Sequence, residues 1–316
     1  AVQHEAMSRR RSVIAPWARL VQRGLQQGAR ESARIVGKAL ARTAAQRAAP
    51  TGPGDWLPGL AACPAGMRRF RLYRPPGVRR SERLPLLVML HGCGQDARSF
   101  ARLTRMNRLA ARERFLVLYP EQDRLSHGQG CWHWYDTRSG RAWSEVAVIL
   151  AAIDQVCLLH PADRQRVAVA GLSAGASMAA LLAIRHPDRF RAVVMHSGLA
   201  PGAADSQLSA LGAMQGQRQA MRRVAEGMSP SGRPKGEYRR AQPEGTPVST
   251  DPTRWPPLLV IHGQRDGIVA PDNALAAATL WADSAGARPS VARTVQRGQR
   301  HPMAITDYKA RGGRLV

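Results

Sequence analysis

The stretch Val167–Ala183 reads VAVAGLSAGASMAALLA and decides the fold. A short apolar run enters the five-residue turn Gly171–Gly175, and an alanine-rich helical run leaves it. A G-x-S-x-G turn between a strand and a helix is the context of a nucleophile elbow. Glycines at the two ends of the turn carry no side chain that would collide where the helix folds back against its strand. The pattern predicts that Ser173 is a nucleophile at the tip of a strained turn. A structural Gly-Ser turn is the alternative.

Short apolar runs on both sides of this turn alternate with helical stretches. Continuous apolar runs are typical of strands that are buried on both faces of a parallel sheet. Strands that alternate with helices indicate a sheet with helices on both faces. We therefore predict the α/β class with a mostly parallel central sheet. The expected strands are Arg68–Tyr73 (an edge hairpin strand), Leu84–Leu90, Phe115–Pro120, Arg191–Met195 and Leu258–Ile261, and the expected helices are Phe100–Ala111, Trp143–Leu159 and Asn273–Ala285.

Composition divides the chain into two parts. Residues 1–50 are basic and rich in alanine, with apolar residues at helical spacing and arginines between them. This pattern is typical of a basic amphipathic helix. We expect a helical or partly disordered extension, either a solvated arm or an anchor to a partner surface. Residues 51–316 form the predicted catalytic domain, in which the polar, Gly-, Pro- and Arg-rich residues from about 200 to 255 are an insertion.

The formal net charge of +25 is carried almost entirely by arginine. The arginines are spread through the whole chain without aromatic interleaving or a zinc-finger or helix-turn-helix pattern, so nucleic-acid binding is not expected as the main function. Attraction to a granule or another acidic surface through the extension is consistent with the charge.

Location and redox state are constrained only loosely. The apolar runs are too short to cross a bilayer, and we find no signal-peptide pattern, so we expect a cytoplasmic protein, with an extracellular one as the alternative. The four cysteines show no C-x-x-C spacing, so we expect no metal site. They are free thiols or form one or two bridges, and the pairing stays open. They are Cys63, Cys93, Cys131 and Cys157.

Three polar segments follow the ends of predicted strands and are expected to converge. They are the loop 91–93, Ser173 and Asp266. In open α/β sheets the site lies at the carboxyl ends of the strands. A nucleophilic serine needs a histidine as base and an acid that orients it. Asp266 suits the acid, with a structural turn as the alternative role and Asp272 as the second choice.

The predicted oxyanion hole uses two backbone N–H groups. One belongs to Ala174, directly after the nucleophile, and the other to Cys93 in the loop after an earlier strand. Each donor is worth roughly 3 kcal/mol of transition-state stabilisation. His91 is expected to support this loop.

Four segments together carry a family resemblance. They are Met89–Gln95 (MLHGCGQ), Gly130–Asp136 (GCWHWYD), Gly171–Ala176 (GLSAGA) and Gly263–Val269, which contains Asp266. From about Trp56 to its end, the chain resembles the poly(3-hydroxybutyrate) depolymerase family of esterases. The resemblance implies an α/β-hydrolase fold and hydrolysis of 3-hydroxyalkanoate esters without a cofactor. It also implies that Trp132 lines the acyl groove, with core packing as the alternative.

The catalytic histidine departs from the family pattern. In the family it lies on a loop after the last strand, in a Gly-His-Ala-Trp-like motif that this sequence does not contain. Gly312–Val316 resembles the beginning of that strand, so the resemblance implies a truncated domain that lacks its last strand and histidine loop, with the base beyond Val316. His301 is the candidate base within the chain, because it is the only histidine after Asp266.

The sequence therefore predicts a serine carboxylic-ester hydrolase that acts on poly(3-hydroxybutyrate) or 3-hydroxyalkanoate oligomers through an acyl-enzyme. Two alternatives stay open. One is a feruloyl or acetyl-xylan type esterase of the same fold. The other is a catalytically impaired hydrolase-fold binding protein that docks through residues 1–50.

Overall fold

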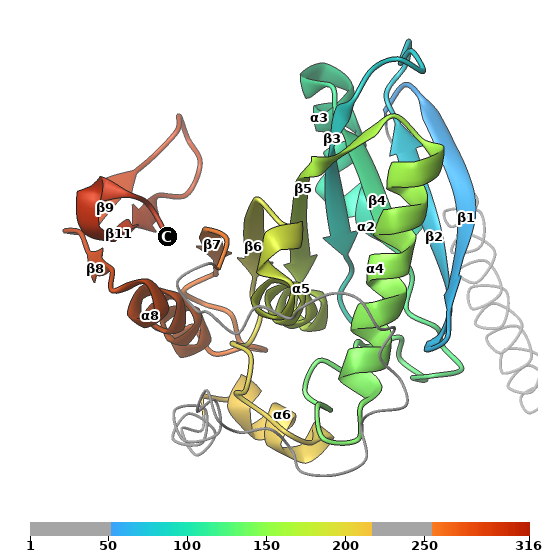
Figure 1. Ribbon diagram of the computed structural model, residues 1–316. Helices are drawn as coiled ribbons and strands as arrows, with labels where there is room; N and C mark the ends of the chain where they lie inside the picture. Colours follow the sequence, from blue (N-terminus) through green and yellow to red (C-terminus); the bar gives the residue numbers. More distant parts are fainter. Residues whose placement is uncertain (1–51, 217–254) are drawn as a thin grey trace, which may run out of the picture. The chain divides into compact units, whose positions relative to one another are not determined.

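The structure is a computed structural model that describes residues 52–216 and 255–316, so the extension 1–50 and most of the insertion lie outside the described residues. A seven-stranded sheet has the order β1-β2-β4-β3-β5-β6-β7 (Figure 1). Strands β3 to β7 are parallel to one another, and β2 is antiparallel to both of its neighbours, β1 and β4. The mostly parallel sheet expected from the apolar runs is confirmed. The strands are β1 Asp55–Cys63, β2 Gly66–Arg74, β3 Leu84–Leu90, β4 Leu116–Pro120, β5 Ala162–Leu172, β6 Ala192–His196 and β7 Leu258–Ile261.

The edge of the sheet is formed by β1, which the sequence pattern did not indicate. Pro58 and Gly59 interrupt its apolar pattern. Proline is tolerated on an edge strand because one side of the strand has no neighbour to bond. Glycine is required at position 59, because a Cβ there would overlap the ring of Phe70 on β2.

Two hydrophobic layers cover the sheet, one on each face. The first layer contains residues of α4 (Arg141–Leu159), α5 (Ala174–Arg185) and α8 (Asp272–Ala285), and the second contains residues of α2 (Ala97–Thr104) and α3 (Met106–Glu113). Side chains of β3 alternate between the layers, as expected for a strand covered on both faces. Helix α4 is long and apolar enough to cross a bilayer, but Ile149 and Ile153 on it are buried in the first layer, which is the pattern of a core helix.

Two helical segments differ from expectation. The single helix predicted over Phe100–Ala111 is divided into α2 and α3 at Arg105, which has a left-handed backbone with φ 53°. The insertion contains a short helix, α6 (Gln207–Met214), whose first turn is capped by the Ser206 side chain. A 3₁₀ turn, η1 (Pro187–Arg189), connects α5 to β6.

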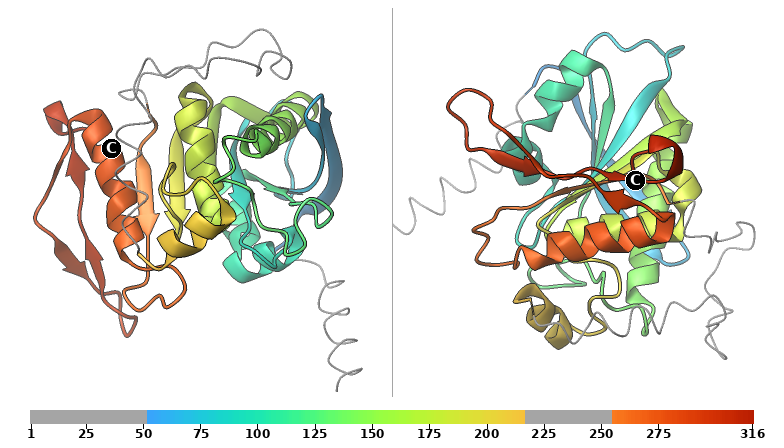
Figure 2. Two further views of the ribbon diagram at one scale, coloured as in Figure 1. Left: turned by 90° about the horizontal axis from the view of Figure 1, so that it is seen from below. Right: turned by 90° about the vertical axis from the view of Figure 1, so that its left-hand side faces the viewer.

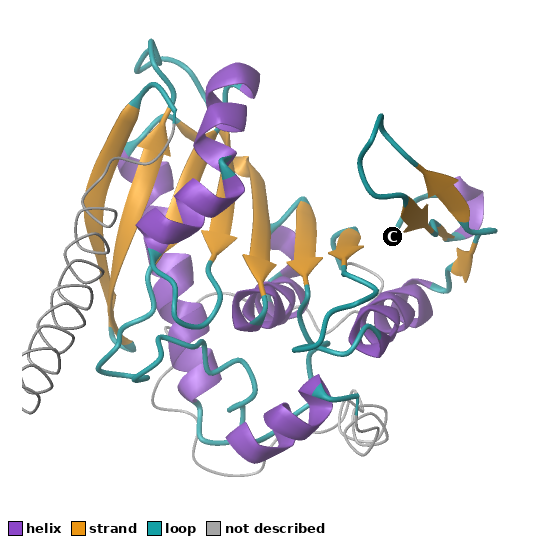
Figure 3. Ribbon diagram, turned by 180° about the vertical axis from the view of Figure 1, so that it is seen from behind, coloured by secondary structure: helices purple, strands orange, loops and turns teal. Residues whose placement is uncertain are grey.

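The C-terminal segments form two small ladders apart from the main sheet (Figure 3). Strand β8 (Arg288–Pro289) pairs with β11 (Tyr308–Lys309), and β9 (Arg293–Val295) pairs with β10 (Met303–Ile305). The expected start of a last strand is instead the 3₁₀ turn η5 (Arg311–Gly313), followed by an isolated bridge from Leu315 to Lys309. Among the residues that the structure describes, no strand pairs with the outer edge of β7.

Because β3, β5, β6 and β7 are parallel, their carboxyl ends lie at one edge of the sheet, which the left view of Figure 2 faces. The segments after these strands carry all the residues predicted for the site except His301 and Trp132.

Candidate active site

Ser173 lies between β5 and α5 with φ 55° and ψ −123°, a conformation that is strained for a residue with a side chain. The flanking glycines explain how this turn fits. A Cβ at Gly171 would lie 2.5 Å from the backbone nitrogen of Ala176, and a Cβ at Gly175 would lie 2.5 Å from the carbonyl oxygen of His91. The first glycine lets the helix fold back on its own strand, as expected. The second lets the helix cross the end of the neighbouring strand β3.

The loop after β3 lies against Ser173. A Cβ built on Gly92 would lie 3.6 Å from the Cβ of Ser173. Within residues 52–216 and 255–316, the backbone N–H groups of Cys93 and Ala174 donate no hydrogen bond. The Ala174 group is also at the N-terminus of α5, where the helix dipole favours negative charge. Two free N–H groups beside a serine hydroxyl are the arrangement that holds an oxyanion.

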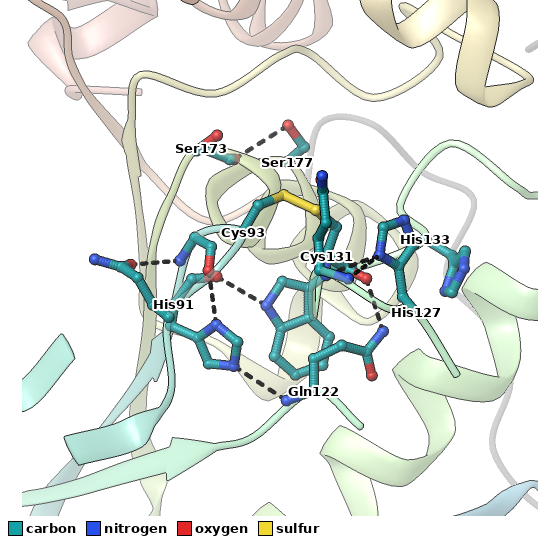
Figure 4. Close-up of a disulfide and its surroundings, with 12 residues drawn as sticks. His91, Cys93, Gln122, His127, Cys131, His133, Ser173 and Ser177 are labelled. Atoms are coloured by element: carbon teal, nitrogen blue, oxygen red, sulfur yellow. Dashed lines mark hydrogen bonds between the residues drawn. A yellow bond between two sulfur atoms is a disulfide. The ribbon is translucent and has the colours of Figure 1, made fainter. Parts of the chain in front are cut away.

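A disulfide joins Cys93 to Cys131, in the loop after β4 (Figure 4). The same two loops are also joined by a backbone hydrogen bond of 2.7 Å from Gly94 N–H to the Gln129 carbonyl. Cys63 and Cys157 are free thiols. The structure thus selects one bridge among the pairings that the sequence left open, and it attaches the bridge to the predicted oxyanion loop.

Trp132 occupies a different place from the groove-lining position that the resemblance implied. Its side chain has no exposed surface, and its indole N–H donates a 2.9 Å hydrogen bond to the His91 carbonyl. A side chain without exposed surface packs in the core, and through its bond to His91 it supports the loop after β3. This matches the core-packing alternative.

A buried polar network holds the loop after β4. Gln122 donates from its side-chain amide to the Cys131 carbonyl at 3.0 Å and to the Glu145 carboxylate on α4. The other Glu145 oxygen accepts from the His133 backbone N–H at 2.8 Å, and Arg68 on β2 donates to the Gln122 side chain. Burial lowers the pKa of Arg68, with the Glu145 charge opposing the shift. Bonds from both β2 and α4 therefore fix this loop, and within the described structure the Arg68 Nε is the one atom of Arg68 and its partners here that is buried without a hydrogen bond.

Asp266 follows β7 in a tight turn. One carboxylate oxygen accepts hydrogen bonds of 3.0 Å from the backbone N–H groups of Ile268 and Val269. These bonds, that of Val269 most, hold the pKa of Asp266 below its usual range. The other oxygen lies 3.5 Å from Nε2 of His262. The structural turn considered as an alternative is therefore present, and it leaves the second oxygen for a further partner. Asp272, the second choice for the acid, is the exposed first residue of α8.

A chain of contacts connects Ser173 to Asp266 across β6. The Ser173 N–H donates to the His196 carbonyl at 2.9 Å, and the Ser197 N–H donates to the Ile261 carbonyl at 2.9 Å. Interaction with the Ser197 side chain also lowers the pKa of Asp266. The predicted nucleophile, acid and oxyanion donors thus lie at one edge of the sheet. His196 ends the intervening strand β6 and is exposed, and partial burial, followed by the nearby His262, lowers its pKa.

His301 lies in the exposed connection between β9 and β10. Within the described ranges it makes no hydrogen bond or ion pair, and none joins it to Ser173 or Asp266. The other expected position of the base, beyond Val316, lies outside this sequence.

A hollow of about 420 Å³ adjoins the disulfide-linked loops. Its lining residues are Cys93, Gly94, Arg124, Gly128 and Gln129. The described part of the chain contains no group of three or more His, Cys, Asp or Glu side chains placed to hold a metal ion.

Comparison with known proteins shows the family of this chain. The family model for esterase PHB depolymerases matches residues 68–226, half of the chain. The chain belongs to this family. The matched residues include the elbow, the loop after β3 and the whole buried network, so the resemblance seen in the motifs is confirmed.

Two curated relatives and one solved structure are similar to this family member. Poly(3-hydroxyalkanoate) depolymerase C of Paucimonas lemoignei is 31% identical over 152 residues, which are 48% of this chain and 36% of that protein. Feruloyl esterase B of Thermothelomyces thermophilus is 28% identical over 204 residues, 64% of this chain and 66% of that protein. The chain thus spans less than two thirds of the length of either relative.

The acetyl xylan esterase from Aspergillus awamori superposes with a TM-score of 0.55 at 19% identity, covering 83% of this chain and 93% of that one. At this identity the likeness concerns the fold alone. The α/β-hydrolase fold expected for this esterase PHB depolymerase family member is confirmed.

Proposed function

We propose that this chain is a serine carboxylic-ester hydrolase that acts on poly(3-hydroxybutyrate) or 3-hydroxyalkanoate oligomers through an acyl-enzyme. One observation carries the proposal. Ser173 is held at φ 55° beside two backbone N–H groups, of Cys93 and Ala174, that have no partner in the described structure. Strained backbone at a polar turn is characteristic of functional sites.

The proposed reaction has two steps. The Ser173 hydroxyl oxygen attacks the ester carbonyl carbon while a histidine takes its proton, and the N–H groups of Cys93 and Ala174 stabilise the resulting oxyanion. The bond to the alcohol oxygen then breaks as the histidine returns the proton to it, and an acyl-serine remains. Water attacks the acyl-serine in the same way and releases the acid.

The second carboxylate oxygen of Asp266, which lies 3.5 Å from His262 Nε2, is proposed to orient that histidine and to stabilise its charged form. His301 is the only histidine after Asp266 in the sequence, but its side chain makes no bond to the acid, so it is the weaker candidate for that histidine. Variants of this histidine decide its role, as argued in the Discussion.

A fluorophosphonate probe that reacts with activated serines tests the nucleophile. We expect covalent labelling of Ser173 and of no other serine, and loss of labelling in Ser173→Ala. Ser177→Ala is the matched control, because Ser177 lies one helical turn away and is fully buried. Labelling that persists in Ser173→Ala would remove the serine-hydrolase proposal.

The substrate class separates the proposal from its main alternative. The feruloyl esterase and acetylxylan esterase relatives favour a feruloyl or acetyl ester as the second candidate. Turnover should be compared on 3-hydroxybutyrate oligomers and on methyl ferulate. Faster turnover of methyl ferulate would support the alternative, and labelling of Ser173 without turnover of either ester would support an impaired binding protein.

Location and docking are proposed on separate grounds. The Cys93–Cys131 bridge favours an oxidising compartment, because such bonds are rare in the reducing cytosol. This supports the extracellular alternative over the cytoplasmic expectation. The basic residues 1–50, which lie outside the described residues, are proposed to attach the enzyme to a granule or another acidic surface. Salt-dependent binding that disappears when residues 1–50 are deleted would support this.

A further inference from the structure

We propose that His91 is a positioning residue of the oxyanion hole. Its neutral imidazole, together with Gln95, fixes the peptide between Gly92 and Cys93 so that the Cys93 N–H is aimed at the substrate oxygen. The inference rests on the proposed function, and it assigns to His91 a task that is distinct from proton transfer.

The hydrogen bonds of His91 determine where its proton lies. Nδ1 is 2.9 Å from the Gly92 carbonyl, which can only accept, so Nδ1 carries the proton. The backbone N–H of Gln122 donates to Nε2 at 3.1 Å, so Nε2 is bare. The two contacts together specify one neutral tautomer. Burial lowers the pKa of His91, which is consistent with this neutral form.

The Gly92 carbonyl and the Cys93 N–H belong to the same peptide unit. The unit is planar and trans, so the two groups point in opposite directions and turn together. The carbonyl oxygen accepts from His91 Nδ1 and, at 3.2 Å, from the Gln95 N–H. Both of its lone pairs are therefore engaged, and the direction of the Cys93 N–H is fixed without any bond to that N–H itself.

Gln95 also determines which N–H group is left free. Its side-chain oxygen accepts from the Gly92 N–H at 2.9 Å, so that group is not available to substrate. The next N–H along the chain, that of Cys93, has no partner in the described structure. The loop therefore presents a single free donor next to Ser173, together with that of Ala174.

His91 itself is held on two further sides. Its carbonyl accepts from the Trp132 indole N–H, and its ring is only 5.4 Å from the Trp132 ring between centroids. The residue is 1% exposed, so its imidazole has no access to substrate or to the Ser173 hydroxyl from solvent. These contacts favour a fixed support over a proton-transfer group.

Two substitutions of His91 test the hydrogen bonds of its two ring nitrogens one at a time. Asparagine places an amide N–H near the position of Nδ1, and glutamine places its amide near the position of Nε2. We expect His91→Asn to keep kcat for a p-nitrophenyl ester within about threefold, because the bond to the Gly92 carbonyl is kept. We expect His91→Gln to lower kcat by about 10- to 100-fold with little change in KM, because the oxyanion donor is no longer aligned.

A second measurement, the NMR chemical shift of the Cys93 amide, does not depend on catalytic activity. With ¹⁵N-labelled cysteine, the Cys93 amide resonance should keep its chemical shift in His91→Asn and move in His91→Gln. Urea unfolding of both variants controls for stability, since both remove the same ring. Equal kcat and equal Cys93 shifts in the two variants, or failure of both to fold, would overturn the positioning role.

The outcomes also separate this inference from the proposed function. Equal kcat in His91→Asn and His91→Gln, with turnover that still depends on Ser173, would overturn the role of His91 alone. Wild-type turnover that does not depend on Ser173 would overturn both.

Discussion

Gly92 faces Ser173 so closely that a Cβ built on Gly92 would be in van der Waals contact with the Cβ of Ser173, at 3.6 Å. Because Gly92 has no side chain, the backbone itself borders the nucleophile, and the neighbouring Cys93 N–H is brought near the place where an ester carbonyl would be attacked. The close approach extends to the far side of the turn, where Gly175 lies against the Leu90 and His91 carbonyls. The site thus depends on backbone packing, and several tests follow from that.

Gly175→Ala should destabilise the fold. The new Cβ would lie 2.5 Å from the His91 carbonyl oxygen. The atoms around it are backbone atoms of Leu90 and His91, which cannot shift without a large cost in free energy. We expect the free energy of unfolding in urea to fall by about 3 kcal/mol. Gly128→Ala is the control, because nothing lies within 4 Å of its Cβ, and it should change the free energy of unfolding by less than about 0.5 kcal/mol. Equal effects of the two substitutions would contradict the packing argument.

Asp266→Asn distinguishes a catalytic acid from a turn residue. The asparagine oxygen can still accept from the Ile268 and Val269 N–H groups, so the turn should persist. The loss of charge should lower kcat by about 10³- to 10⁴-fold, as for other triads that lose their carboxylate. An unchanged far-UV spectrum together with wild-type kcat would leave Asp266 with a structural role only.

In the same variant, the free energy of unfolding should depend less on pH at acidic pH than it does in wild type. Backbone hydrogen bonds lower the pKa of Asp266 in the folded state, so its contribution is fully present above the unfolded pKa of about 4 and is lost as the pH falls through the lower folded value. Urea unfolding between about pH 2 and pH 6 should therefore show a smaller loss of stability in Asp266→Asn than in wild type. Parallel curves for the two proteins would contradict this pKa shift.

His301→Gln should leave kcat within about twofold of wild type. The side chain is exposed and has no bond to a described residue, so the substitution resembles an ordinary surface change. Ester turnover and Ser173 labelling both check this. A loss of 100-fold or more, with normal unfolding, would instead assign the general base to His301.

The parts of the site that were predictable depend on local sequence. The elbow was predictable because Gly171 must be glycine where the helix folds back on its own strand, whereas the contact of Gly175 with the end of β3 appears only in the structure. The strands were predictable because burial on both faces requires continuous apolar runs. The acid turn at Asp266 and the loop at Cys93 follow directly from the ends of such strands.

The parts that were missed depend on tertiary contacts. Strand β1 contains Pro58 and Gly59, and only the ring of Phe70 explains the glycine. The division of the predicted helix at Arg105 has no proline or glycine to signal it. The burial of Trp132 could not be read from a motif, because an aromatic side chain in a polar loop suits a groove as well as a core. The partner of Cys93 was open because four cysteines allow several pairings.

The Cys93–Cys131 bridge gives the last prediction. The bridge joins two cysteines that are 38 residues apart in sequence, and it connects the oxyanion loop to the network around Gln122 and Glu145. Cys131→Ser should therefore lower the free energy of unfolding by about 3–4 kcal/mol through the larger entropy of the unfolded chain. It should also lower kcat by about tenfold, because the Cys93 N–H is held less firmly.

The free thiol Cys157 offers the matched control, and Cys157→Ser should leave kcat unchanged. Treating wild type with a phosphine reductant should reproduce the effect of Cys131→Ser and should add nothing in that variant. Full activity of the reduced wild type would show that hydrogen bonds alone, without the bridge, hold the Cys93 peptide in place.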